Sequence, residues 1–300
     1  MLITFCGVRG STPAPGADYV RYGGSTSCVA VAHGPGEVPV LALDAGTGLA
    51  NLTGLLGGAA FTGTILLTHL HWDHCLGVPF FRGGDRDDAR VTLLMPEQEA
   101  GGRDGAGGAK EPRGAGGAGG TGTAERLLTQ VMAPPFFPIT PRQLRGSWEF
   151  GLIAPGQHKA EGFTVEAREI PHKGGRTFGY RVSDGRAVLA YVTDHCPTNL
   201  GPGPDGLGAY HEAAVELARD ADLLIHDAQL TAEEVPAEAD FGHAAAEYAA
   251  GLAARAGARR LALFHHKPSR TDDQLDAIGR RFAAGPLPVL VAAEGLTLEL

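Results

Sequence analysis

Short apolar runs separated by glycine-rich turns recur along the chain and predict a strand-rich fold. In the first half such runs cover residues 2–6, 27–32, 38–44, 64–68 and 91–95. In the second half they cover residues 163–170, 178–182, 187–194, 221–227, 259–265 and 287–293. These runs have the length and composition of buried strands.

Three segments of the second half instead carry apolar residues near a period of 3.6, which predicts helices over 209–220, 243–257 and 271–283. The second of these would begin at His243 and close at Gly257, a residue type suited to a helix end. Because strands alternate with helices mainly towards the C-terminus, we expect an α/β (α+β) fold. Two packed mixed β-sheets would have helices outside, in a single domain over residues 1–300.

Residues 101–123 break this pattern. They read GGRDGAGGAKEPRGAGGAGGTGT and hold part of the glycine excess of the chain, 45 of 300 residues. Because such a segment cannot bury enough apolar area to order itself, it predicts a flexible insert rather than a binding arm.

The formal net charge of −9 argues against an extended nucleic acid as partner, since nucleic acid favours a basic face. No run reaches the roughly 18 apolar residues that span a bilayer, so we expect no membrane contact and a cytoplasmic protein. The four cysteines lie far apart without a CxxC pair, which predicts free buried thiols. The sequence leaves the oligomeric state open, and a homodimer is compatible with it.

The segment THLHWDHCLG (68–77) places four potential metal ligands in six positions, directly after an apolar run. They are His69, His71, Asp73 and His74. Buried imidazole and carboxylate groups need partners, and strand ends are where α/β folds bind ligands. Nitrogen and oxygen ligands suit zinc first, with manganese or iron as alternatives. A polar loop whose side chains bond one another is the competing interpretation.

Further strand ends carry the same residue types. His172 follows the run 163–170, Asp194 ends the run 187–194, and His265 ends the run 259–265. A lone histidine after a strand is usually not a ligand. The regular recurrence nevertheless favours a site for two divalent ions, with Asp194 placed to bridge them.

These motifs resemble the metallo-β-lactamase superfamily. HLHWDH matches its HxHxDH signature, and LDAGTG (43–48) resembles its first motif. IPHKGGRTFGYRV, YVTD and the region from LLIHDAQ to LFHH resemble ribonuclease Z-like enzymes and small cyclic-phosphate phosphodiesterases. FCGVRGSTPAPG and YGGSTSCV near the start also look like bacterial members of that branch, so the resemblance covers nearly the whole chain.

The resemblance implies an αββα sandwich with a dinuclear site at one edge of its sheets. One metal ion would take His69, His71 and His172. The other would take Asp73, His74 and His265, with Asp194 as the bridge. Asp44 would not bind a metal ion itself but would orient the ligands through hydrogen bonds.

The resemblance also places His243 near the scissile phosphate, as proton donor or phosphate stabiliser. A helix start favours an anion there, although a histidine bonded to the backbone would look the same in sequence. Asp227 would hold His243 or a ligand in place. Further candidates for substrate contact are Ser25, Thr26, His195, His266 and Phe136, and core packing competes for the last three.

The residues therefore predict metal-assisted hydrolysis of a small anionic substrate by a hydroxide held between two ions. Asp73 and His243 are the expected catalytic residues. A phosphodiesterase acting on a small cyclic or linear nucleotide or sugar phosphate is the first hypothesis. A hydrolase of a lactone, thioester or other carbonyl substrate is the alternative, and a ribonuclease Z-type endonuclease ranks third.

Overall fold

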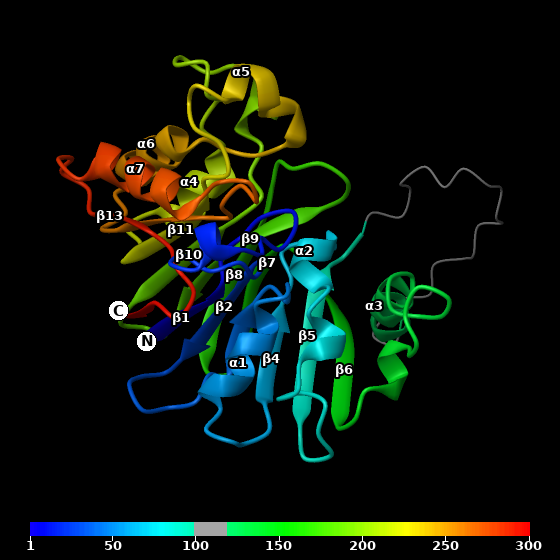
Figure 1. Cartoon of the computed structure of the whole chain (residues 1–300). Coiled ribbons are helices and arrows are strands. Elements are labelled where there is room, and N and C mark those ends of the chain that lie inside the picture. Colours follow the sequence, from blue (N-terminus) through cyan, green and yellow to red (C-terminus); the bar gives the residue numbers. More distant parts are fainter. Residues whose placement is uncertain (99–118) are drawn as a thin grey trace, which may run out of the picture.

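The computed structural model describes residues 1–98 and 119–300 and is built on two seven-stranded sheets (Figure 1). The first sheet has the order β14-β1-β2-β3-β4-β5-β6 and the second β13-β12-β11-β10-β9-β8-β7. The first contains β1 (Leu2–Gly7), β2 (Cys28–Ala32), β3 (Leu41–Leu43), β4 (Thr62–Leu66), β5 (Arg90–Pro96), β6 (Ser147–Ile153) and β14 (Thr297–Glu299). The second contains β7 (Gly156–Ala160), β8 (Phe163–Ile170), β9 (Thr177–Ser183), β10 (Val188–Val192), β11 (Leu223–Asp227), β12 (Leu261–Phe264) and β13 (Val289–Val291).

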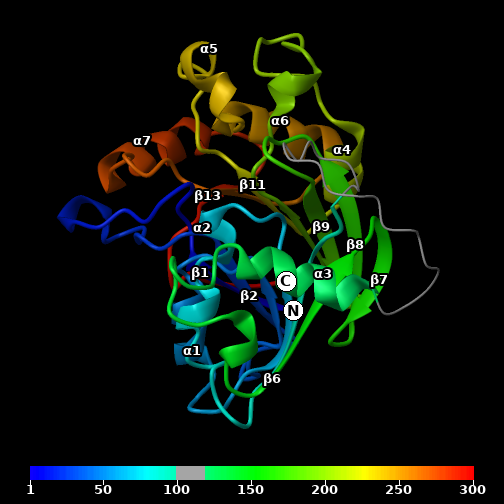
Figure 2. The same cartoon turned by 90° about the vertical axis from the view of Figure 1, so that its right-hand side faces the viewer.

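Helices lie on the outer side of each sheet (Figures 1 and 2). On the first sheet they are α1 (Leu49–Leu55) and α3 (Gly119–Thr129), and on the second α4 (Glu212–Ala218), α6 (Ala246–Ala256) and α7 (Asp272–Phe282). Two single turns, α2 (Trp72–Cys75) and α5 (Val235–Glu238), complete the α-helices of the described residues. Both sheets contain parallel and antiparallel pairs. The expected class, two packed mixed sheets with helices outside, is confirmed.

The largest apolar core fills the space between the sheets. Phe5 of β1 packs against Phe264 of β12 with ring centroids 6.0 Å apart, and Phe264 packs against Tyr191 of β10 at 5.7 Å. All three rings are fully buried. Burial of such side chains is the main favourable term that holds one sheet on the other.

Several elements were missed or misplaced by the sequence pattern. β7 reads GQHKA and is mostly exposed, so this edge strand has no apolar face to reveal it. The predicted insert ran too far, because residues 119–123 belong to α3, whereas residues 101–118 lie outside the described residues. Glycine disfavours helix, but Ala124 and Leu128 bury one side of α3 beside β6 and override that preference.

The prediction that His243 opens a helix is wrong. α6 begins at Ala246, and the segment before it is extended, because Leu230 pairs with Ala244 and Ala246 through backbone hydrogen bonds. Gly257 does close α6 with a left-handed backbone, φ 72°, as expected. The four cysteines are free and buried, also as expected.

Strand direction decides where the predicted polar residues meet. β3 and β4 run parallel in the first sheet. In the second sheet β10, β11 and β12 are parallel, and β8 shares their direction because both β8 and β10 pair antiparallel with β9. The residues after these strands therefore gather at one edge. Within the described residues, no helix is long and apolar enough to cross a membrane.

Candidate metal centre

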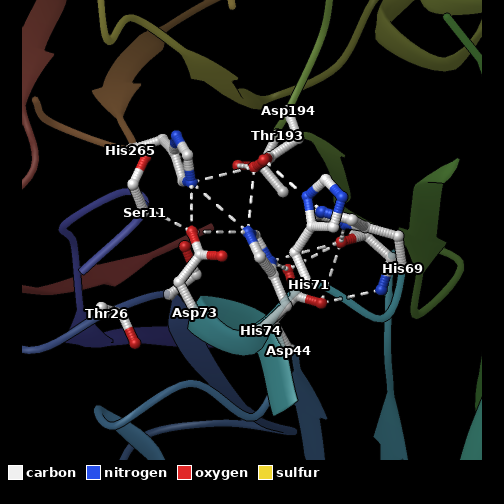
Figure 3. A network of polar contacts seen from close by, with 12 residues as sticks. Ser11, Thr26, Asp44, His69, His71, Asp73, His74, Thr193, Asp194 and His265 are labelled. Carbon is white, nitrogen blue, oxygen red and sulfur yellow. Dashed lines mark hydrogen bonds and ion pairs between the residues drawn. The ribbon is translucent and has the colours of Figure 1, made fainter. Parts of the chain in front are cut away.

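Three groups of potential ligands meet at this edge: two of them share the carboxylate of Asp194 (Figure 3), and the third, Asp227, His243 and His265, shares His265 with the second. The first group is His69, His71, His172 and Asp194, and the second is Asp73, His74, Asp194 and His265. Within each group the ligand atoms lie within 4.8 Å of one another. The structure thus brings together all seven residues that the sequence predicted as ligands.

The two oxygens of Asp194 face different groups. Oδ2 lies 3.6 Å from Nε2 of His69 and 3.5 Å from Nε2 of His172. Oδ1 lies 3.0 Å from Nε2 of both His74 and His265. A carboxylate in this position can bind two cations at once, one through each oxygen.

Asp73 and Ser11 complete the second group. Oδ2 of Asp73 lies 3.1 Å from Nε2 of His265 and 3.3 Å from Nε2 of His74. The backbone N–H of Ser11 donates to the same oxygen at 2.6 Å, which fixes the carboxylate. The sequence pattern gave no signal for Ser11, because the contact links residues 62 positions apart.

The hydrogen bonds behind the histidines test whether these residues suit a metal ion. Nδ1 of His172 donates to the Gly242 carbonyl at 2.9 Å, and Nδ1 of His74 donates to Oδ2 of Asp44 at 2.8 Å. With the proton on Nδ1, Nε2 carries the lone pair that a metal ion needs. Nε2 of His69 is buried without a hydrogen-bond partner among the described residues. The donor set therefore fits divalent metal ions.

Asp44 is fully buried and joins several parts of this network. Its carboxylate accepts from the Thr68 N–H at 2.7 Å, the Thr68 hydroxyl at 3.0 Å and the Tyr191 hydroxyl at 2.9 Å. The hydroxyl oxygen of Thr68 also lies 3.0 Å from Nδ1 of His69. Thr68 and Tyr191 were missed in the sequence, although both stand beside recognised motifs.

Charge and burial shift the pKa values of the cluster strongly. Burial lowers the pKa of His69 well below its ordinary value. For His265, burial also favours the neutral ring, but Asp194 and Asp73 outweigh it and raise the pKa to about 10. Burial opposes charge on Asp194 as well, yet His265 and His74 hold its pKa well below the usual range. Without metal, His265 and His74 thus take up protons that a bound metal ion would displace.

Backbone strain concentrates here. Among the described residues, six non-glycine positions have positive φ, and four of them belong to this cluster: Ser11, Asp44, Asp194 and His265. The left-handed region is costly for most side chains and persists where surrounding contacts impose it, often at functional sites.

The comparisons with known proteins agree with this geometry. Residues 121–266 match the model of the beta-lactamase superfamily domain. Ribonuclease Z of Bacillus mycoides is 26% identical over 244 residues, which are 67% of this chain and 69% of that protein. Residues 121–266 thus carry the similarity to the metallo-β-lactamase superfamily domain.

Solved structures of the superfamily fold cover nearly the whole chain. The metallo-beta-lactamase fold protein YhfI from Bacillus subtilis is 17% identical with a TM-score of 0.65, and the match covers 99% of both chains. A diphosphatase of the PhnP family is 18% identical with a TM-score of 0.63, and the match covers 100% of this chain and 97% of the other. At these identities the likeness shows the fold alone.

A pocket of about 400 Å³ opens onto the two groups of potential ligands that share Asp194. It is lined by Ser11, Leu70, His71, Trp72, Asp73, His172, Asp194, Phe241 and His243. Nδ1 of His243 lies 3.0 Å from Oδ2 of Asp227, and Asp227 also accepts from the backbone N–H groups of His195, Gln229 and Ala244. Because Nδ1 of His243 is hydrogen-bonded to Asp227, Nε2 is the nitrogen that can contact a bound substrate.

Other candidate substrate contacts lie away from this pocket. Nδ1 of His195 donates to Nε2 of His226, and His266 donates to the Ala292 carbonyl, so both are buried inside the fold. Thr26 is buried beside Thr47, and the Ser25 N–H donates to Glu294. None of these four side chains lines the pocket, and those of His195, His266 and Thr26 are hydrogen-bonded inside the fold.

Proposed function

We propose that this chain is a metal-dependent hydrolase that cleaves a phosphodiester in a small anionic substrate. The donor set and the superfamily domain support metal-dependent hydrolysis. One observation favours the phosphodiester: the Asp227–His243 pair reaches the same pocket as the shared carboxylate Asp194. Similarity to ribonuclease Z over two thirds of both chains agrees with it.

Divalent ions held by the two groups would supply Lewis acidity and lower the pKa of water towards about 7. Asp194 and Asp73 would keep the ligand atoms in place, and the Ser11 N–H fixes Asp73 from the loop side. Hydroxide, formed when water of lowered pKa gives a proton to solvent, would attack phosphorus while the bond to the leaving alkoxide breaks. His243 would donate the proton that the alkoxide takes up, with Asp227 holding its ring in orientation.

The proton-donor role can be tested through the leaving group. Metal-reconstituted wild type and His243→Gln would be compared on bis-p-nitrophenyl phosphate and on a cyclic nucleotide. The p-nitrophenolate ion leaves without a proton, whereas an alkoxide needs one. We therefore expect His243→Gln to slow the cyclic nucleotide by about 10²- to 10⁴-fold and the aryl ester far less.

His266→Gln is the matched control, since His266 also adjoins a ligand but is hydrogen-bonded away from the pocket. Metal content should equal that of wild type in both variants. Equal loss on both substrates would assign His243 to another role. Faster turnover of a lactone or thioester than of any phosphodiester by the wild type would overturn the proposed function.

A further inference from the structure

A second cavity adjoins the metal pocket and has a different character. It measures about 440 Å³ and is lined by Trp72, Leu76, Gln130, Val131 and Phe136. Trp72 lines both cavities, because it stands between His71 and Asp73 in the ligand segment. No ionisable side chain is among the lining residues, so this cavity is neutral and mostly apolar.

The aromatic side chains of this cavity are unusually exposed. Trp72 is 69% exposed and Phe136 is 84% exposed, while Leu76 is 40% exposed. Leaving such side chains in water forgoes the free energy of burial, and clustered exposed apolar residues mark interaction sites. Phe136, which the sequence indicated as a substrate contact, thus lies at the second cavity and not at the metal pocket.

Continuity with the metal pocket limits what can occupy this surface. A molecule whose phosphate reaches Asp194 must pass beside Trp72 to leave the pocket on this side. Its next part would meet two aromatic rings and no charge. Aromatic side chains stack on planar bases of any sequence, and a volume of about 440 Å³ is in the range of small-molecule sites.

We propose that Trp72 and Phe136 form a stacking subsite for a planar nucleobase of the substrate, while its phosphate lies at the metal centre. This proposal rests on the proposed function and narrows the substrate class to nucleotide phosphodiesters. The base can come from a small nucleotide or from the end of an RNA strand, since both present the same ring beside a phosphate.

The chain offers a direct readout of this contact. It contains two tryptophans, Trp72 and Trp148. Trp148 donates to the Gly84 carbonyl at 2.9 Å and lies outside both cavities, so Trp148→Phe leaves Trp72 as the only indole reporter. Adenosine monophosphate, added to the metal-loaded Trp148→Phe protein, should quench the Trp72 emission with saturation. Ribose 5-phosphate, which lacks the base, should bind more weakly and quench little.

Variants of Phe136 separate stacking from general apolar contact. Phe136→Ala should weaken adenosine monophosphate binding by about 5- to 100-fold, and Phe136→Tyr should retain it. Phe136→Leu keeps an apolar side chain without a ring and should resemble Ala. Val20→Ala is the control, because Val20 is an apolar residue that is 73% exposed but lines neither cavity.

A pair of substrates with and without a nucleoside distinguishes a base of a small nucleotide from a base of RNA. Thymidine 5′-(p-nitrophenyl phosphate) and methyl p-nitrophenyl phosphate share the scissile bond and leaving group, so the ratio of their kcat/KM values isolates the nucleoside. Phe136→Ala should lower this ratio if the base belongs to a small nucleotide. If Phe136→Ala lowers kcat/KM only on a short single-stranded RNA, the base belongs to RNA.

Several results would overturn the proposal. Equal binding of adenosine monophosphate and ribose 5-phosphate would exclude base stacking, as would full activity of Phe136→Leu. A concentration-dependent Trp72 emission that nucleotides leave unchanged, with dimers seen in light scattering, would assign the surface to a second copy of the chain. Base-dependent quenching without turnover would retain the subsite and refute the proposed hydrolysis.

Discussion

Replacing Asp44 by Asn tests whether the carboxylate behind His74 controls metal binding. Asn is nearly the same size, and it tolerates the left-handed backbone that Asp44 adopts, φ 62°. The substitution therefore changes hydrogen bonding and charge with little backbone cost. Asp44 accepts from Thr68, His74 and Tyr191, all donors in the present structure, and is fully buried.

The Asn side chain has one accepting oxygen and must place its NH2 group towards one of these donors. The Thr68 backbone N–H cannot become an acceptor, so an NH2 group facing it would cost about 1–3 kcal/mol in folding free energy. His74 can instead move its proton from Nδ1 to Nε2 and accept from the new NH2 group. We expect this second arrangement, which leaves no lone pair on Nε2 for a metal ion.

Loss of such a supporting partner weakens metal affinity by about 10- to 100-fold, which equals about 1.4–2.7 kcal/mol. The assay is a titration of metal-free protein with Zn²⁺ against a competing chelator, with urea unfolding of the metal-free protein alongside. Tyr191→Phe is the control, since it removes one hydrogen bond to the same Oδ2 but leaves His74 bonded. Wild-type affinity in Asp44→Asn would refute the reasoning about the proton on His74.

Other consequences of the structure can be measured independently. The pKa of His265 is raised to about 10, so its charged form stabilises metal-free protein fully below its ordinary pKa of about 6.5, and this contribution is lost as pH rises towards 10. Urea unfolding in a chelator should therefore show stability falling across that window, and a flat profile would contradict the assigned contacts. Asp194→Gly suits the positive φ of this position and removes both carboxylate oxygens, so it should lower metal content in both groups. Loss in one group only, seen in spectra of Co²⁺-substituted protein, would show that the carboxylate is not shared. Phe264→Ala should reduce the free energy of unfolding by about 3–5 kcal/mol in a urea titration, since it leaves a cavity between the sheets, and a change below 1 kcal/mol would mean that the core collapses around it.

The local sequence determined which potential metal ligands stand together and where most strands lie. His69, His71, Asp73 and His74 are close in sequence, so their proximity after β4 needs no tertiary information. Apolar runs defined most of the strands because burial on both faces leaves a continuous hydrophobic signature. The family motifs then indicated which distant strand ends belong to the same site.

Only the tertiary structure decided the contacts made by residues without such a signature. The Ser11 N–H reaches Asp73 because β1 and β4 belong to the same sheet. The Tyr191 hydroxyl reaches Asp44 across 147 residues because packing of the two sheets brings their edges together. His195 is buried against His226 and Tyr248 of α6, and His266 is buried beside Ala292, whereas Trp72 stays exposed at the pocket. Side-chain direction and exposure depend on what lies across the interface, and a linear pattern of residue types contains no information about that neighbour.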